Sequence, residues 1–448
     1  MNSRGWSPKV AVVVLVVMVV VGLAFAGSMN FGLAQTPTTV NGIIYSDTTW
    51  TKTNSPYMLT GPVAINKDVT LTIEPGTTVS LNDYYIKVEG TLRAKGTNAN
   101  KIYLGNGRVY FWNTSSDWNE VTGSGSIIEN AILTSSIEVH INDTSPKINK
   151  NSISGWIDCE YSSSIISNND IEGAIRVSFS YTVISGNTIH NGAIGVDCSS
   201  DYRSIISNNT ISGGETGIIS AGARDATISN NVIRDCAVGI DAVGSTIEQN
   251  VITNNGRGVL DRSAEIILNN TIVNNTVGVY TQNNKPIVFN NIHNNSEYNI
   301  RLDKLSKYNV NATYNWWGTT DVQAINQSIH DFKNDFNLGN VTFIPFLTEP
   351  NPQAGPNTIL TAVTPSPTST SATTPTPNQS ANPSPSPSVS SMPTQSTSPS
   401  SSQNPEASPA ATQTELHIVI GVLATAVVAL TVAVAVLLRR ARKTNLEA

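Results

Sequence analysis

Residues 206–212 read Ile-Ser-Asn-Asn-Thr-Ile-Ser, and residues 228–234 read Ile-Ser-Asn-Asn-Val-Ile-Arg. Similar phrases, in which an aliphatic residue precedes Asn by two or three positions, recur between residues 127 and 291. Their last asparagines are Asn130, Asn151, Asn169, Asn187, Asn209, Asn231, Asn250, Asn270 and Asn291, in steps of 18 to 22 residues. A period near twenty without helical spacing excludes a helical repeat and favours a solenoid of short strands.

Each repeat offers two or three short strands in which aliphatic and polar residues alternate, separated by Asn or Gly turns. Asn tolerates the left-handed conformation that a sharp corner requires. If each repeat forms one coil, these corners stack about 4.8 Å apart, and the Asn amides can bond to one another along the stack. The sequence therefore predicts an all-β parallel β-helix with Ile and Val inside.

A second column supports the same register. Eight residues after the repeated Asn comes a small or turn-forming residue, and Val or Ile follows each time. These positions are Gly195, Gly217, Gly239, Gly258, Gly278 and Asn299.

Both ends of the chain carry signals for a membrane. Arg4 and Lys9 precede an aliphatic run, which predicts a signal peptide or an uncleaved anchor over residues 1–26. Residues 416–438 carry no Asp, Glu, Lys or Arg and are long enough for one transmembrane helix. The basic residues of 439–448 predict a cytoplasmic tail.

Thirteen of the 22 prolines lie between residues 351 and 415, in a stretch of Ser and Thr that predicts a disordered stalk. We therefore expect a single-pass protein of the cell membrane whose folded part is extracellular, with N-x-S/T sequons that predict a glycoprotein. The formal charge of -6 argues against nucleic acid as a partner. Three cysteines cannot make a disulfide-dense scaffold, and we expect them to be buried thiols.

Three motifs carry a resemblance to a known family. Residues 70–79 read TLTIEPGTTV, residues 88–92 read VEGTL, and residues 314–318 read YNWWG. They resemble the first coils and the closing motif of the right-handed parallel β-helix proteins of the NosD-like and pectate-lyase-like superfamily, in their prokaryotic cell-surface form. The resemblance implies a right-handed helix, and it is specific for fold rather than for function.

On this basis the folded part divides into an N-terminal cap with the first coils at 36–120, repeats at 121–318 and a C-terminal cap at 319–350. Residues 321–332 place Val322, Ile325, Ile329 and Phe332 on one helical face that could plug the last coil. Trp316 and Trp317 suit either this cap, which we favour, or a platform for a sugar.

One outward-facing column contains charged residues. It reads Asp158, Arg176, Asp197, Ile219, Asp241, Leu260, Tyr280 and Arg301. Asp158, Arg176, Asp197 and Asp241 are the candidate catalytic residues, and Tyr280 and Arg301 are candidates for binding carbohydrate. The resemblance to pectate-lyase-like proteins implies that such carboxylates could bind Ca²⁺ or act on a uronate. The alternative is a solvated face of ion pairs.

No resident cofactor or metal site is predicted, because the five histidines are scattered along the chain. Two functions remain open. The favoured one is a structural or adhesive surface module that binds carbohydrate, since no convergent acid–base cluster is visible in the sequence. The alternative is a membrane-tethered polysaccharide lyase, hydrolase or epimerase.

Overall fold

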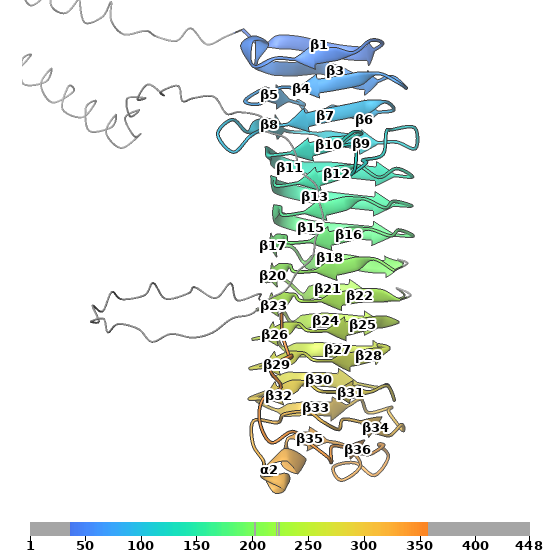
Figure 1. Cartoon of the computed structure of the whole chain (residues 1–448), viewed down its shortest axis with the longest axis vertical. Coiled ribbons are helices and arrows are strands. Elements are labelled where there is room, and N and C mark those ends of the chain that lie inside the picture. The colour runs from blue at the N-terminus through green and yellow to red at the C-terminus, as the bar shows by residue number, and fades with distance from the viewer. Residues whose placement is uncertain (1–35, 201–202, 221, 223–224, 357–448) are drawn as a thin grey trace, which may run out of the picture. The chain divides into compact units, whose positions relative to one another are not determined.

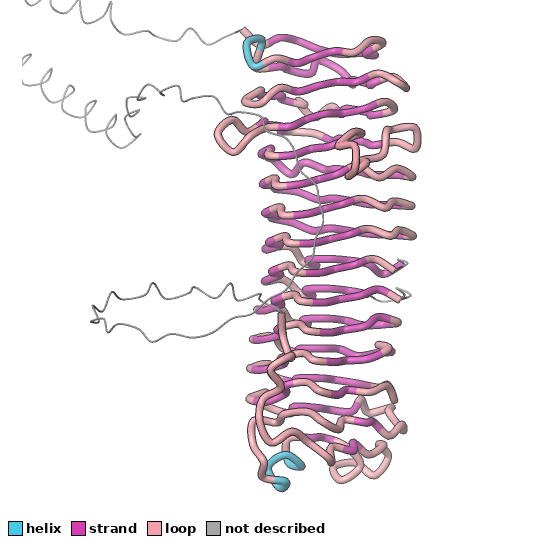
Figure 2. Tube along the Cα trace, viewed as in Figure 1, coloured by secondary structure: helices cyan, strands magenta, loops and turns pink. Residues whose placement is uncertain are grey.

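The computed structural model describes residues 36–356 except 201–202, 221 and 223–224. These residues form a stack of coils in which each strand pairs in parallel with the equivalent strand of the next coil (Figure 1; Figure 2). Apart from one short α-helix and one 3-10 turn, the regular elements of this part of the chain are all strands. The predicted parallel β-helix is confirmed.

One face, here called the ladder face, is a twelve-stranded sheet with one strand from each coil. Its strands are β2 (Thr48–Trp50), β4 (Thr70–Ile73), β7 (Thr91–Lys95), β10 (Ile127–Glu129), β12 (Lys147–Asn149), β14 (Ile165–Ser167), β16 (Val183–Ser185), β19 (Ile205–Ser207), β22 (Ala226–Ser229), β25 (Ser245–Glu248), β28 (Ile266–Leu268) and β31 (Ile287–Val288).

A second face, here called the long-strand face, will carry the candidate site. Its strands are β3 (Tyr57–Ile65), β6 (Tyr85–Val88), β9 (Arg108–Phe111), β11 (Ala131–Asn142), β13 (Ser152–Glu160), β15 (Asp170–Ser178), β18 (Ile194–Ser200), β21 (Thr216–Ser220), β24 (Val238–Val243), β27 (Arg257–Ser263), β30 (Val277–Thr281), β33 (Tyr298–Leu302) and β35 (Ile329–His330).

The third face, here called the short-strand face, lies around a corner from the second. Its strands are β5 (Thr78–Ser80), β8 (Ile102–Gly105), β17 (Thr188–His190), β20 (Thr210–Ser212), β23 (Val232–Arg234), β26 (Val251–Thr253), β29 (Thr271–Val273) and β32 (Asn291–His293), while β1 (Thr38–Ile44) pairs with β3 at the N-terminal end. Because β3, β11 and β15 bend around this corner and pair with strands on both faces, the two faces form one sheet.

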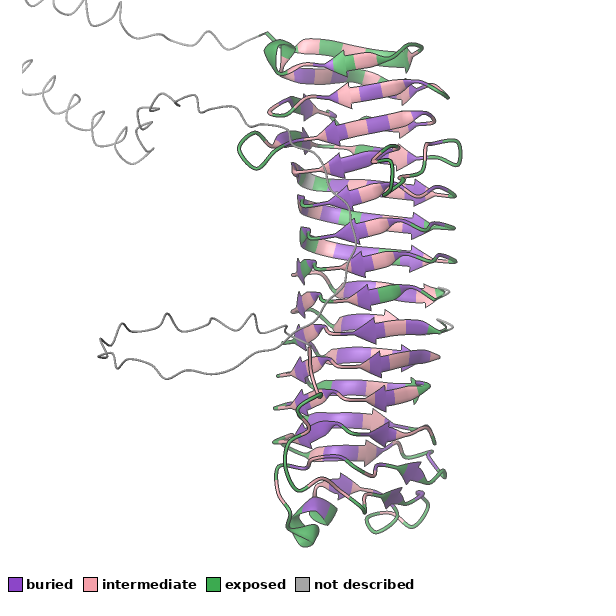
Figure 3. Cartoon of the chain, viewed as in Figure 1, coloured by how far each residue is buried: buried purple, intermediate pink, exposed green. Residues whose placement is uncertain are grey.

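Stacks of aliphatic side chains fill the interior. Figure 3 marks the buried residues in purple along the strands of the coils. Every member of the ladder-face stack is at most 1 % exposed: Ile128, Ile148, Ile166, Ile184, Ile206, Ile228, Ile247, Ile267 and Ile287. Ile is well suited to this position, because its branched Cβ packs closely on a pleated sheet. Burial of these stacks is the main favourable contribution to folding.

The predicted Asn ladder is present inside one corner. It consists of Asn151, Asn169, Asn187, Asn209, Asn231, Asn250, Asn270, Asn290 and Asn315, and each backbone N–H and Nδ2 donates to Oδ1 of the next. The sequence-based list was one residue off at each end. Asn130 instead takes the left-handed corner at φ 51°, and Asn291 lies in strand β32.

The predicted glycine column is also confirmed. A Cβ on Gly217 would lie 2.7 Å from the carbonyl oxygen of Gly239, and equivalent approaches run from Gly195 to Asn299. A short second Asn ladder, which the sequence did not suggest, joins Asn255, Asn275 and Asn295 beside this column. The glycine column lies at the start of strands β18 to β33 of the long-strand face, and the second Asn ladder precedes β27, β30 and β33.

The C-terminal coil is capped, but with less helix than expected. Helix α2 covers only Val322–Gln327, and Ile329 belongs to β35, which pairs with β33. The expected helical face is therefore wrong for Val322 and Phe332, which are both 48 % exposed, while Ile325 is buried. Trp317 is 3 % exposed and contacts Phe343 edge to face, as the cap prediction requires. Strands β34 (Val310–Asn311) and β36 (Val341–Thr342) complete this end.

After the cap the chain returns along the coils. Asn351 donates through Nδ2 to Asn269 Oδ1 at 3.0 Å, and its N–H donates to Asn291 Oδ1 at 2.8 Å. Thr271 Oγ1 donates to the carbonyl of Ala354 at 2.8 Å. The first residues of the expected stalk, 351–356, therefore lie against the solenoid beside β29 and β32.

The expected signal segment 1–26, the remainder of the stalk, the apolar segment 416–438 and the tail 439–448 lie outside the described residues. Within the part that the structure describes, no helix has the length and apolar character needed to cross a membrane. At the N-terminal end, the 3-10 turn η1 (Lys52–Asn54) is capped by Thr51. The three cysteines are buried and form no disulfide, as predicted.

Candidate functional site

The outward column of the long-strand face has the predicted register. Strand pairing aligns Tyr110, His140, Asp158, Arg176, Asp197, Ile219, Asp241, Leu260, Tyr280, Arg301 and His330. Each residue stands one strand spacing from the next, about 4.8 Å. The alignment also extends the predicted column by two coils at the N-terminal end, to His140 and Tyr110, and by one coil at the C-terminal end, to His330.

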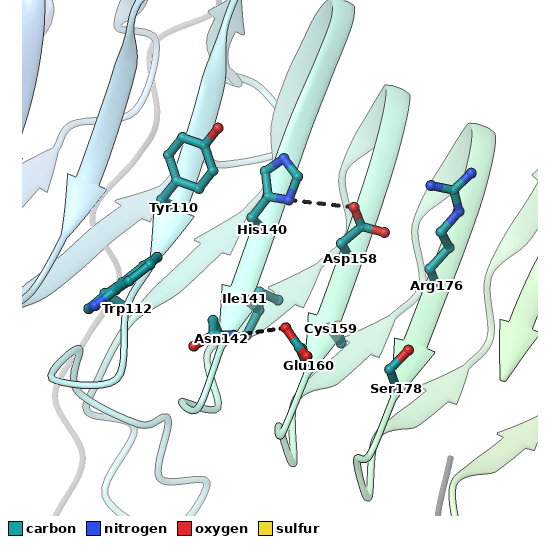
Figure 4. A pocket seen from close by; sticks show the side chains of 10 residues that line it. All are labelled: Tyr110, Trp112, His140, Ile141, Asn142, Asp158, Cys159, Glu160, Arg176 and Ser178. Carbon is teal, nitrogen blue, oxygen red and sulfur yellow. Dashed lines mark hydrogen bonds and ion pairs between the residues drawn. The ribbon is translucent and has the colours of Figure 1, made fainter. Parts of the chain in front are cut away.

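The N-terminal part of this column lies in an open cleft of about 330 Å³, here called the N-terminal cleft. Its polar lining includes Tyr110, His140, Asp158, Glu160 and Arg176, which come from β9, β11, β13 and β15. Figure 4 shows the Tyr110 hydroxyl, the His140 ring and the Arg176 guanidinium on the same side of the sheet. The loop over residues 112–126 begins at its edge with Trp112, which also lines the cleft.

His140 is the centre of this cleft. Its Nε2 lies 3.0 Å from Glu138 Oε2, and its Nδ1 lies 3.4 Å from Asp158 Oδ2 (Figure 4). The ring stacks on Tyr110 with 4.8 Å between centroids and 17° between planes. These contacts hold the imidazole upright on the sheet, between a phenol and a carboxylate.

Glu138 decides which nitrogen of His140 carries the hydrogen. Its Oε2 also accepts from Arg108 Nε at 2.9 Å, and the hydrogen bond from His140 together with Arg108 holds the pKa of Glu138 below its usual range. An ionised carboxylate can only accept, so Nε2 is the donor to Glu138. The contact with Glu138 is shorter than the contact with Asp158, so in the neutral imidazole Nε2 carries the hydrogen and Nδ1, on the side of Asp158 and the cleft, is the basic nitrogen.

Arg176 is held by an aromatic ring rather than by a carboxylate. Its guanidinium lies over the ring of Trp156, 4.4 Å from the centroid. Although Asp158 and Asp197 occupy the neighbouring rungs, no ion pair of Arg176 occurs among the residues that the structure describes. Its planar, two-pronged group therefore faces the cleft with a free capacity to bind a carboxylate.

The other two catalytic candidates lie away from His140. Asp197 is one rung beyond Arg176, where its carboxylate accepts from the backbone and hydroxyl of Ser199. Asp241 is two rungs further and forms a two-point ion pair with Arg262 at 2.7 and 3.0 Å. Of the four predicted residues, the structure thus brings only Asp158 and Arg176 into the N-terminal cleft.

The two carbohydrate-binding candidates lie in a second cleft of about 450 Å³, here called the C-terminal cleft. Arg257, which the sequence did not single out, lies over the ring of Tyr280 at 4.8 Å, and Arg301 lies 5.9 Å from the same ring. Tyr280 donates its hydroxyl to Asp303 Oδ2 at 2.8 Å. Burial, and then this hydrogen bond, raises the pKa of Tyr280, so the phenol keeps its hydrogen at neutral pH.

The predicted column did not include His140, although strand pairing places it one rung before Asp158. Asp158 and Arg176 each follow their ladder Asn by seven residues, from Asn151 and Asn169. In the preceding coil Ala131 takes the ladder position, so His140 follows by nine. The register shift between Leu133 and Ile137 of β11 adds these two residues.

Among the described residues, no group of three or more His, Cys, Asp or Glu side chains is arranged to hold a metal ion. Ca²⁺ needs six to eight oxygen ligands. Around Asp158 the neighbouring rungs supply an imidazole and a guanidinium instead, so this part of the column does not fit the calcium ion that the family resemblance implied.

A family model for the right-handed β-helix region matches residues 135–263. The chain therefore carries a right-handed β-helix region, as the sequence predicted. No curated protein matches the sequence.

Among solved structures, the fold is similar to the periplasmic alginate epimerase AlgG, with 15 % identity over 64 % of this chain and 77 % of that one, at a TM-score of 0.33. It is also similar to the A-module of the Azotobacter vinelandii mannuronan C-5 epimerase AlgE4, with 12 % identity, 70 % and 87 % coverage and a TM-score of 0.26. At these values the chemistry of this chain has to be argued from its own residues.

Proposed function

We propose that the long-strand face acts on an acidic polysaccharide, and that the N-terminal cleft removes the proton next to a uronate carboxylate. The observation that supports this most directly is the convergence of His140, Asp158 and Arg176 on neighbouring rungs of one cleft. The adhesive hypothesis was favoured because no such acid–base cluster was visible in the sequence. The cluster in the cleft makes the enzymatic hypothesis the better supported one.

The proposed chemistry starts with the substrate carboxylate on Arg176. Arg176 binds it in two-point fashion and neutralises the charge that develops there. His140 Nδ1 takes the proton from the adjacent carbon, and the electron pair of the broken C–H bond moves into the carboxylate. Asp158 then accepts a hydrogen bond from the new N–H, as a positioned carboxylate does for an imidazolium.

The arrangement favours elimination over epimerisation. His140 and Tyr110 stack on each other and reach the substrate from the same side of the sheet. In an elimination, the electron pair returns to form a C=C bond, the glycosidic C–O bond breaks, and Tyr110 gives its hydroxyl proton to the leaving oxygen on that side. Epimerisation would need a proton donor on the opposite face of the sugar. A polysaccharide lyase is therefore the specific activity that we propose.

We also propose that the protein acts at the cell surface, anchored in the membrane by one segment. The support is in the sequence alone: the apolar runs within 1–26 and 416–438, and the basic tail that follows the second. The Ser-, Thr- and Pro-rich residues between the solenoid and this anchor would act as a spacer.

The test is to incubate the full chain with alginate and polygalacturonate, with and without Ca²⁺, and to follow the unsaturated uronate ends by ultraviolet absorbance. His140→Gln should lower the rate by about 10²–10⁴-fold, the range expected for loss of a general base. His190→Gln is the matched control, because His190 pairs with Asp170 on the short-strand face and should leave the rate unchanged. A His140→Gln protein with full activity would refute the assignment.

A second candidate, a binding module without catalysis, is supported by the C-terminal cleft, where aromatic and guanidinium groups gather around Tyr280. Retention of acidic polysaccharide by the full chain without any new ends or altered sugars would favour it over the lyase.

A further inference from the structure

The C-terminal cleft resembles a binding site more than a reaction centre. Tyr280 stands between the coils of Arg257 and Arg301, and both guanidinium groups lie beside its ring. Its hydroxyl is already engaged by Asp303. The ring therefore holds two guanidinium groups in place over it, which suits the binding of an anionic group on a sugar.

Neither arginine of this cleft is closely paired with a carboxylate, unlike some other arginines of the described chain. Arg262 and Arg108 each lie within 2.9 Å of a carboxylate oxygen. Arg257 takes part in no ion pair within the described part of the chain, and Arg301 reaches only Glu297, at 3.4 Å with both side chains well exposed. An exposed pair of this kind contributes little, so both groups retain the capacity to bind an anion.

Arg257 shares its arrangement with one other residue of the same face. Arg176 in the N-terminal cleft is also stacked on a ring, at 4.4 Å from Trp156, and also lacks an ion pair among the described residues. A guanidinium that is ordered by a ring loses less side-chain freedom when it binds a planar carboxylate in two-point fashion. The face thus carries two guanidinium groups that are ordered in the same way.

The spacing between these two groups follows from the coils. From β15, which carries Arg176, to β27, which carries Arg257, the pairing passes through β18, β21 and β24. Four steps of about 4.8 Å separate the two strands by about 19 Å along the axis. The rungs between them lie on the same exposed face.

We propose that the C-terminal cleft is an anchoring site that holds a uronate carboxylate of the same polysaccharide chain between Arg257 and Arg301, which Tyr280 keeps in place. This rests on the proposed function for its class of ligand, an acidic polysaccharide. A polymer long enough to span both clefts binds them together, because the second contact is then intramolecular. An oligosaccharide shorter than the span binds only one cleft at a time.

The test measures binding rather than turnover, and uses the full chain with His140→Gln so that the ligand is not consumed. Calorimetric titration with alginate should give at least about tenfold weaker binding for Arg257→Gln/Arg301→Gln, as expected when two charge-assisted contacts are lost. Arg203→Gln/Arg234→Gln is the control of equal charge, since these residues pair with Asp225 and Asp235 elsewhere on the coils. It should bind alginate like the parent.

Two further measurements complete the test. An alginate trisaccharide, which is too short to span the clefts, should bind the parent more weakly than the polymer does, and neutral dextran should not bind. Arg257→Lys, which keeps the charge but not the planar group, should weaken alginate binding several-fold and covers the case in which the double variant does not fold.

Parent-like alginate binding by both the double variant and Arg257→Lys would overturn the anchor. Binding of dextran sulfate as tight as that of alginate would overturn the carboxylate site in favour of a general charge effect. The two proposals fail separately, because the lyase is judged by turnover in the chain with His140 intact, and the anchor by affinity in the chain without it.

Discussion

The N-terminal and C-terminal clefts occupy the same column of the same face, but the charged groups around the central ring have opposite signs. In the N-terminal cleft, Glu138 and Asp158 flank an imidazole and fix its hydrogen-bond pattern. In the C-terminal cleft, Arg257 and Arg301 flank a phenol ring whose hydroxyl is already bonded. Each coil contributes one outward-facing side chain to the column. The same backbone can therefore support a candidate reaction centre at one place and a candidate anchor at another.

This difference indicates that the chemistry of each cleft depends on which side chains occupy successive rungs of the outward column. A histidine between carboxylates has a defined acceptor nitrogen and can move a proton. An aromatic ring between arginines has no group free to do so, but presents surface and charge. The comparison can therefore be tested by removing equivalent groups from each cleft.

The largest expected difference is between the two ring-stacked arginines. Arg176→Gln should lower kcat by about 10²–10³-fold, since it removes the cation that stabilises the developing charge. Arg257→Gln should instead raise KM for the polymer several-fold and leave kcat unchanged, because it removes binding that is equal in the ground and transition states. Steady-state kinetics on alginate measures both. A similar loss of kcat from both substitutions would contradict the distinction between the clefts.

A smaller effect, on stability, is expected when an asparagine is removed from the ladder in the coils between the two clefts. Asn231 lies in a coil between them. Its side-chain amide donates to Ile206 O and Asn250 Oδ1 and accepts from the backbone N–H of Asn209. Asn231→Ala should lower the free energy of unfolding by about 3 kcal/mol, because buried backbone groups lose their partners at about 1–3 kcal/mol each. Urea unfolding measures the change.

The control for this substitution is Thr210→Ala on the short-strand face, which should change stability by less than about 0.5 kcal/mol. A ladder variant as stable as this control would show that the Asn amides do not determine the stability of the central coils.

The smallest expected effect is on the pH dependence of the activity that we assign to the N-terminal cleft. The lowered pKa of Glu138 means that its contact with His140 is fully present above the usual Glu pKa and is lost as pH falls through the lowered value. Arg108→Gln removes one cause of the lowering, so Glu138 should take up its proton, and lose its contact with His140, at a higher pH, which moves the acid limb of kcat/KM to higher pH.

The pH dependence of alginate binding by His140→Gln serves as the comparison for this prediction, since it involves no proton transfer by His140 and should not change with Arg108→Gln. A shift of the acid limb to lower pH would contradict the role of Glu138.

The sequence predicted the outward column from Asp158 to Arg301 correctly, because both Asn and Gly corners repeat at countable positions and side chains alternate along a strand. It did not extend the column to His140, where β11 has two residues more than β13 between Leu133 and Ile137. The helix expected at the C-terminal cap gave way to strand β35 because Ile329 can pair with Ile300 of the last coil.

By itself, then, the sequence determined the solenoid: a period near twenty, aliphatic residues in alternation and asparagines at the corners each act within one coil or on its immediate neighbour. Only the tertiary structure decided which side chains meet across coils. His140 and Asp158 are 18 residues apart, and Asn351 contacts Asn291 from 60 residues away. Such contacts depend on the exact register of the stacked strands. A single irregularity within a strand, such as the one between Leu133 and Ile137, shifts that register, and the local sequence does not reveal it.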